Sequence, residues 1–127
     1  MRVTITAALL IGATCVAHAA DPAAGANVFK RCVVCHMVGE DAQPRVGPVL
    51  NGLIGRKAGS YEGFKYTEAN KNSGLVWDEA TLAKYLKNPR AAIPGTSMTF
   101  AGIRKDEEIT DLIAYLKQFG PDGKSKP

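Results

Sequence analysis

The feature that most constrains this chain is the pentapeptide CVVCH at residues 32–36. It holds Cys32 and Cys35 with two residues between them, and His36 follows directly. This spacing occurs in thiol–disulfide redox pairs, in parts of zinc sites and where a c-type haem is attached. The rest of the sequence has to discriminate among these three chemistries.

The first twenty residues have the layout of a secretory signal peptide. Arg2 supplies a positive charge, residues 3–16 are apolar or small, and the segment closes with AHAA, which suits cleavage after Ala19 or Ala20. The apolar run is too short for a membrane span, which needs roughly 20 residues. We therefore expect export to the periplasm, with residues 1–20 removed.

Export would change the inventory of metal ligands, because Cys15 and His18 would leave with the signal. Three Cys and His residues would remain, Cys32, Cys35 and His36, whereas a structural zinc site needs four ligands. Zinc is therefore disfavoured. A lipoprotein signal at Cys15 is a minor alternative, since the preceding residue is not the small Gly or Ala expected there.

The charge of the chain argues against nucleic acid as a partner. The formal net charge of +4 falls to +3 once Arg2 is lost with the signal, and the remaining basic residues are scattered. Such a mild excess favours weak, salt-sensitive docking on an acidic protein surface. No later segment could insert stably in a membrane, and we expect a monomer.

Helical patterns separated by long loops indicate a small all-α domain over residues 21–120, followed by a flexible tail over 121–127. No β pattern or internal repeat is visible, and the loop over 39–63 is too long for so small a domain unless it wraps a cofactor. The helices are expected over residues 22–36 (capped by Asp21), 66–71, 79–88 (capped by Asp78) and from near 106 to 119.

Haem attachment agrees best with these features. A thiol redox pair predicts a βαβ context, and no strands are visible to build one. A disulfide between Cys32 and Cys35 would close almost no loop. Both thiols can instead reach the two vinyl groups on one edge of a porphyrin, and His36 then falls under the iron as a ligand. The fold is expected to wrap around one covalent haem c.

Met98 is the candidate for the second axial ligand. Met37 lies beside His36, on the same side of the ring, and no second histidine survives processing. Histidine–methionine ligation fills both axial positions and raises the reduction potential, as suits a carrier of single electrons rather than an enzyme. Two alternatives stay open, a small haem peroxidase-like catalyst and a gas-binding protein with a displaceable Met98.

Several segments together resemble the class I cytochromes c, with the mitochondrial-type and short bacterial periplasmic members most similar. The resemblance runs from Ala24 to Phe119, and its segments are CVVCH, GPVLNGLIGRKAG, YTEANKNSGLVW, YLKNP, IPGTSMTFAGI and DLIAYLKQFG. It implies a soluble one-electron carrier between a quinol-oxidising complex or a dehydrogenase and an oxidase, a reductase or a photosynthetic reaction centre.

The resemblance also implies roles for single residues. Cys32 and Cys35 would form thioethers, His36 and Met98 would bind iron, and the Pro48 carbonyl would accept the histidine N–H. Residues implied to bind the haem propionates are Arg56, Tyr66 and Trp77, and those implied to form a polar network near Met98 are Asn70, Tyr85 and Thr96. Gly25 would meet the C-terminal helix near Leu112 and Tyr115.

A basic rim around the haem edge, which the family uses to dock redox partners, is partly matched. Lysines common in mitochondrial members are replaced by Asn27, Ala91 and Ser97, so steering towards an acidic partner should be weaker. The residues that match the rim are Arg31, Arg45, Arg90, Arg104 and Lys105.

Overall fold

The computed structural model describes residues 17–127. Most of the expected signal peptide, with Cys15 and its lipoprotein alternative, lies outside these residues. The described helices are α1 (Pro22–Phe29), α2 (Glu68–Lys71), α3 (Glu79–Lys87), α4 (Pro89–Ala92) and α5 (Asp106–Lys117). Extended pairing within 17–127 is limited to two isolated bridges, Lys57 with Val76 and Phe119 with Ser125. The predicted all-α fold is confirmed.

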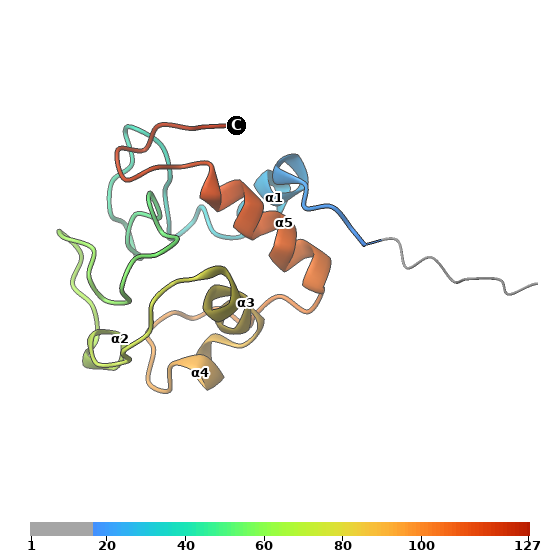
Figure 1. The fold of residues 1–127 in the computed structure, drawn as a ribbon. Helices are drawn as coiled ribbons and strands as arrows, with labels where there is room; N and C mark the ends of the chain where they lie inside the picture. The colour runs from blue at the N-terminus through green and yellow to red at the C-terminus, as the bar shows by residue number, and fades with distance from the viewer. Residues whose placement is uncertain (1–16) are drawn as a thin grey trace, which may run out of the picture.

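Helices α1 and α5 pack directly on each other (Figure 1). Gly25 makes this close approach possible, because a Cβ added there would lie 2.0 Å from the Asp111 carbonyl oxygen and 2.8 Å from Tyr115 Cβ. The expected contact with Tyr115 is present, and Asp111 rather than Leu112 is the other nearest residue. The absent side chain of Gly25 therefore sets the distance between the two helices.

The predicted first helix is wrong beyond Phe29, where α1 ends. The chain continues in tight turns instead, with Cys32 N–H bonded to the Phe29 carbonyl at 2.7 Å and His36 N–H bonded to the Cys32 carbonyl at 2.8 Å. The adjacent β-branched residues Val33 and Val34 have low helix propensity, which favours this departure from helix.

The middle of the chain forms one more helix than expected. Asp78 caps α3 as predicted, since its Oδ1 accepts from Thr81 N–H at 2.7 Å. Asn88 then ends α3, and its Oδ1 accepts from Ala91 N–H at 3.2 Å, which caps the short helix α4. Pro89 occupies the first position of α4, where a missing N–H costs nothing.

Helix α5 begins at Asp106, as predicted, with acidic residues in its first turn, where they offset the helix dipole. Its apolar stripe is buried and packs towards α1 and α3, while α2 packs on no other described helix and lies at the opposite end of the molecule (Figure 1). No helix within residues 17–127 is long and apolar enough to cross a membrane. The buried residues of the stripe are Ile109, Leu112, Ile113 and Leu116.

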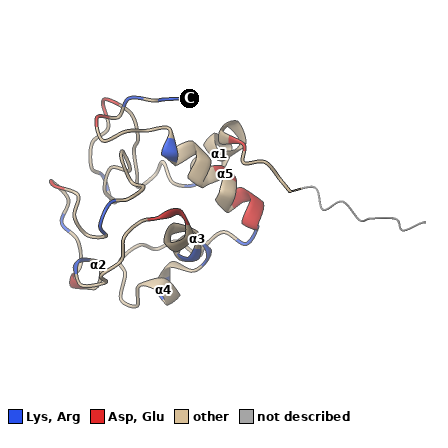
Figure 2. Cartoon of the chain, viewed as in Figure 1, with Lys and Arg blue, Asp and Glu red and all other residues tan. Residues whose placement is uncertain are grey.

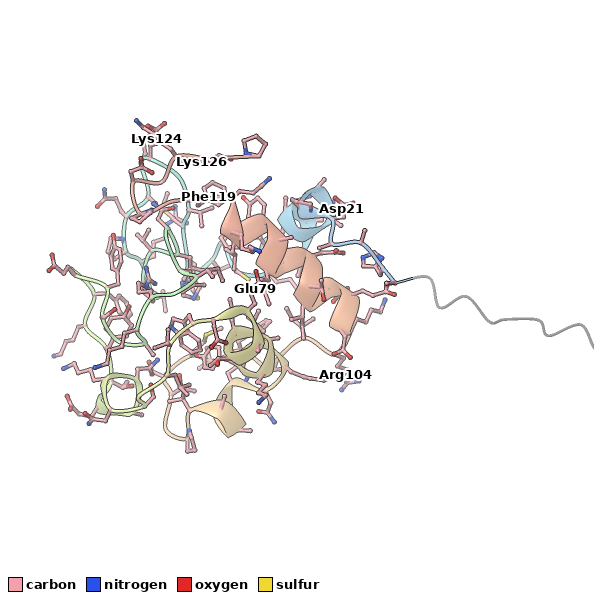
Figure 3. All side chains as sticks on the ribbon, viewed as in Figure 1. Asp21, Glu79, Arg104, Phe119, Lys124 and Lys126 are labelled. Atoms are coloured by element: carbon pink, nitrogen blue, oxygen red, sulfur yellow. The ribbon has the colours of Figure 1, made fainter. Side chains whose placement is uncertain are left out.

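Residues 121–127, expected as a flexible tail, fold back on the domain. Lys126 N–H bonds to the Gln118 carbonyl at 2.7 Å, and a Cβ at Gly123 would lie 2.2 Å from the Gly39 carbonyl oxygen. The returning segment runs beside the start of the long loop, with Lys124 and Lys126 on it (Figures 1 and 3). Its mobility in solution and the domain boundary at residue 120 stay predictions.

Candidate functional site

One cavity brings together every residue proposed from the sequence as a haem contact or iron ligand. It holds about 1250 Å³ of space, part of it open to solvent. Its wall is formed by the turns after α1, by the long loop, by α3, by the loop that follows α4, and by α5. The predicted residues that line it are Cys32, Cys35, His36, Pro48, Arg56, Tyr66, Asn70, Trp77, Tyr85, Thr96 and Met98.

Most of the remaining wall is apolar, and sequence patterns indicate only part of it. The leucines of α3 and α5 follow helical periodicity, so their burial is predictable. Phe64 and Phe100 lie in loops without periodicity, and no sequence signal assigns them to the site. The apolar lining residues outside the predicted set include Phe29, Leu50, Leu53, Phe64, Leu82, Leu86, Phe100 and Leu116.

The two thiols are free and half-buried at the cavity wall. Cys35 N–H bonds to the Cys32 carbonyl at 3.0 Å, so a tight turn sets the relative positions of the two residues. Burial raises the pKa of the Cys32 thiol, with Arg31 opposing this and Cys35 adding to it. Burial therefore favours the protonated form of the Cys32 thiol, which lies at the cavity wall.

His36 has one ring nitrogen committed and one free. Its Nδ1 lies 2.7 Å from the Pro48 carbonyl oxygen, which can only accept, so Nδ1 carries the proton. The backbone of Gly47 packs against the imidazole ring so closely that a Cβ at this position would lie 2.4 Å from His36 Cε1. Burial lowers the pKa of His36, against a smaller opposing effect of Pro48. A neutral, oriented imidazole with a free Nε2 lone pair is the state that a metal ligand requires.

Met98 is held by the hydroxyls of Tyr85 and Thr96. The Tyr85 hydroxyl donates to Met98 Sδ at 3.2 Å, and Met98 N–H donates to Thr96 Oγ1 at 3.3 Å. The Tyr85 hydroxyl and Thr96 Oγ1 also lie 3.4 Å apart, and burial raises the pKa of Tyr85. Asn70 does not join this network: its Oδ1 accepts from Thr67 Oγ1 at 3.0 Å, at the cap of α2.

Arg56 lines the cavity and also donates hydrogen bonds to backbone carbonyls of the long loop. Its Nη1 donates to the Asn51 carbonyl at 3.1 Å and its Nη2 to the Val49 carbonyl at 3.0 Å, and it lies over the Tyr61 ring. Burial lowers its pKa, which Tyr66 and Tyr61 oppose. A guanidinium carries five N–H groups, so Arg56 keeps donors for an anionic group in the cavity.

Tyr66 and Trp77 complete the polar and aromatic side of the wall. The Tyr66 hydroxyl accepts from Tyr61 N–H at 3.3 Å and keeps its own proton to donate, and burial raises the pKa of Tyr66. The Trp77 ring packs against the Tyr85 ring, with centroids 4.8 Å apart. These side chains combine donors for anions with flat apolar surface.

The five expected docking residues differ in what they contact. Of these five, Arg31 alone lines the cavity, and its guanidinium makes two 3.0 Å bonds to the Glu108 carboxylate, which raise the pKa of Arg31 and lower that of Glu108. Arg45 donates to the Val33 carbonyl at 3.0 Å. Arg90, Arg104 and Lys105 are exposed, and Lys and Arg are dispersed over the chain (Figure 2).

A comparison with known protein families agrees with this geometry. The sequence model of the family described as cytochrome c matches residues 22–120. The chain belongs to the cytochrome c family. It is 61% identical over 106 residues to a cytochrome c2 of Rhodoplanes tepidamans, covering 84% of this chain and 99% of that protein. It is 54% identical over 110 residues to cytochrome c2 of Blastochloris viridis, covering 87% of each chain.

A solved structure shares the fold. Cytochrome cH from Methylobacterium extorquens superposes with a TM-score of 0.72 at 43% identity, covering 76% of this chain and 97% of that one. Members of the family are electron carriers with one covalently attached haem c, and the C-x-x-C-H spacing is present here. The cavity fits that group, because two free thiols, a neutral imidazole and a thioether line one largely apolar space.

Proposed function

We propose that this cytochrome c is a soluble periplasmic carrier of single electrons. It would accept electrons from a membrane quinol-oxidising complex or a periplasmic dehydrogenase and pass them to an oxidase, a reductase or a reaction centre. The observation that carries the proposal is that His36 and Met98 line the same cavity, each oriented by a hydrogen bond. Two protein ligands leave no open position for a substrate on iron.

The roles of the site residues belong to the same proposal. Cys32 and Cys35 would form the thioethers, and His36 Nε2 and Met98 Sδ would bind the iron, which would supply the change between ferric and ferrous states. Pro48 and Tyr85 orient the two ligands. Arg56, Tyr66 and Trp77 would bind the propionates. Thr96 completes the polar network beside Met98, and Asn70 lines the same cavity.

Export and docking complete the functional assignment. Residues 17–20 are exposed and lie outside any helix, which would suit a signal peptidase. The protein would work as a monomer, without nucleic acid or stable membrane insertion, and partners would dock at the exposed haem edge. Arg45, Arg90, Arg104 and Lys105 would guide them, while Arg31 contributes less because Glu108 pairs with it.

The test is the absorption spectrum of the oxidised, haem-loaded protein, in which methionine sulfur bound to ferric haem gives a weak charge-transfer band. We expect the band in the wild type and in Met37→Ala, and its loss in Met98→Ala. Met37 is the matched control, because it adjoins His36 in sequence. A wild type without the band, or with rapid binding of carbon monoxide or cyanide at neutral pH, would contradict the carrier and favour the peroxidase-like or gas-binding alternatives.

A further inference from the structure

Asp111 is a charged side chain in the middle of α5 that the haem site does not use. The residue is 6% exposed, at the position where α5 meets α1. Its Oδ1 accepts from the backbone N–H of Asp21 at 2.8 Å and lies 3.1 Å from His18 Nε2. A buried carboxylate is costly unless it is paired and hydrogen-bonded, so the partners of Asp111 matter for stability.

Export would remove one of these two partners. Within residues 17–127, His18 is the single side chain placed to form an ion pair with Asp111, and His18 precedes both expected cleavage points. The Asp21 N–H is the stronger influence on Asp111: it holds the pKa of this carboxyl below its usual range, while burial opposes it and His18 adds less. After processing, the nitrogen of Asp21 would be the remaining partner.

We propose that signal cleavage falls after Ala20 and that the new α-ammonium of Asp21 forms an ion pair with the Asp111 carboxylate, which clamps the start of α1 to α5. This inference rests on the export included in the proposed function. Cleavage would convert a neutral peptide N–H, already 2.8 Å from the carboxylate, into a charged donor at the same place in the chain. Charge-assisted hydrogen bonds are roughly twice as strong as neutral ones.

The two cleavage points that the sequence leaves open would place the new positive charge on different nitrogens. If cleavage falls after Ala19, Asp21 N stays a neutral amide and the positive charge moves to Ala20, about 3.8 Å further along the chain. Ala19 and Ala20 are both exposed, so accessibility does not separate the two points. Asp111 faces the nitrogen of Asp21, so cleavage after Ala20 is the one of the two that places the charge against this carboxylate (Figure 3 labels Asp21 at the start of α1, beside α5).

The surroundings of the Asp21 nitrogen also tolerate a positive charge. An ammonium at a helix N-terminus is opposed by the helix dipole. Two carboxylates offset this effect, that of Asp111 across the helix contact and that of Asp21 itself. The Asp21 side chain caps α1 by accepting from Ala23 N–H at 2.9 Å, so it does not compete for the donor that faces Asp111.

The first experiment is the intact mass and N-terminal sequence of the haem-loaded protein recovered from the periplasm. We expect a chain that begins at Asp21. A periplasmic, haem-loaded protein that begins at Ala20 or earlier would overturn the clamp and leave the carrier function intact. A protein that keeps residues 1–20 inside the cell would overturn both the clamp and the proposed export.

The second experiment is a cycle of four haem-loaded proteins. The chain begins either at Asp21 or, with a replaced signal, at Ala20, and position 111 is either Asp or Asn. Asn keeps an oxygen acceptor, so the variant should fold. With Asp111, we expect the unfolding equilibrium constant of the Asp21 protein to be roughly three- to tenfold smaller than that of the extended protein. In the Asp111→Asn pair, the two equilibrium constants should be nearly equal. A difference between the two chain starts that persists unchanged in the Asp111→Asn pair would overturn the ion pair.

Discussion

Substitution of Gly25 by alanine tests how tightly the contact between α1 and α5 is fitted. The new Cβ would lie 2.0 Å from the Asp111 carbonyl oxygen and 2.6 Å from its carbon. A favourable carbon–oxygen contact is about 3.3–3.6 Å, so α1 would have to move by more than about 1 Å. The blocking atoms belong to the backbone of α5, which cannot rotate away as a side chain can.

Two opposing effects decide the result. Alanine in place of a helical glycine gains up to about 1 kcal/mol of helix propensity. Overpacking costs about 1–3 kcal/mol in ordinary cores, and a backbone clash lies at or above the upper end of that range. We therefore expect Gly25→Ala to lower the free energy of unfolding by at least about 2 kcal/mol, measured by denaturant titration of the haem-loaded protein.

A control isolates the propensity. Ala23 lies in α1 and is exposed, so Ala23→Gly should cost up to about 1 kcal/mol without altering a helix contact. The Met98–iron absorption band should persist in both variants below their unfolding midpoints, because Gly25 does not line the cavity. A Gly25→Ala protein as stable as the wild type, or more stable, would refute the inference that this contact has no room for a methyl group.

Three further predictions concern the site, the acid range and docking. Tyr85→Phe removes the donor to Met98 Sδ. With Met98 as the proposed iron ligand, its sulfur would then donate more strongly to ferric iron, and the reduction potential measured by redox titration should fall. An unchanged or higher potential would contradict this. The Thr81 N–H holds the pKa of Asp78 below its usual value. The stabilising effect of the Asp78 carboxylate is therefore complete above its pKa in the unfolded chain, about 3.9, and is lost as pH falls through its lower pKa in the folded protein. Asp78→Asn should flatten the dependence of stability on acid pH in that window, and equal slopes for both proteins would count against the cap. Glu108→Gln releases Arg31 from its ion pair and should raise the rate of association with an acidic redox partner at low salt. Stopped-flow kinetics should show that this difference in rate shrinks as salt rises. Glu107→Gln in the same helical turn is the control, because it changes the net charge equally and leaves the pair of Arg31 with Glu108 intact.

Local patterns predict the parts of the fold that have local causes. The cap by Asp78 and the start of α5 at Asp106 follow from side chains within one turn of each helix. The apolar stripe of α5 follows from its period alone. In the same way, the C-x-x-C-H spacing is enough to bring two thiols and an imidazole to one wall of a cavity, because a single tight turn carries all three side chains.

Features that depend on distant contacts are missing from the sequence prediction or incomplete in it. The helical pattern of α1 does not show that the chain leaves the helix at Phe29 to direct Cys32 and His36 into the cavity. Helix α4 has a local signal, an Asn cap followed by proline, but its four residues are too few to show a helical period. The return of Gly123 onto Gly39 joins segments far apart in sequence, and nothing local to either segment indicates it.

The placement of the two thiols has a consequence for how the protein is made. Cys32 and Cys35 are half-buried in the closed fold, on a wall completed by segments as distant as Met98 and α5. Haem meets both thiols at full exposure while the chain is still open, and the closed fold then secures what has been attached. A chain that collapsed before it was loaded would half-bury its own attachment points and slow their loading, so an order of assembly is favoured by the architecture of the cavity.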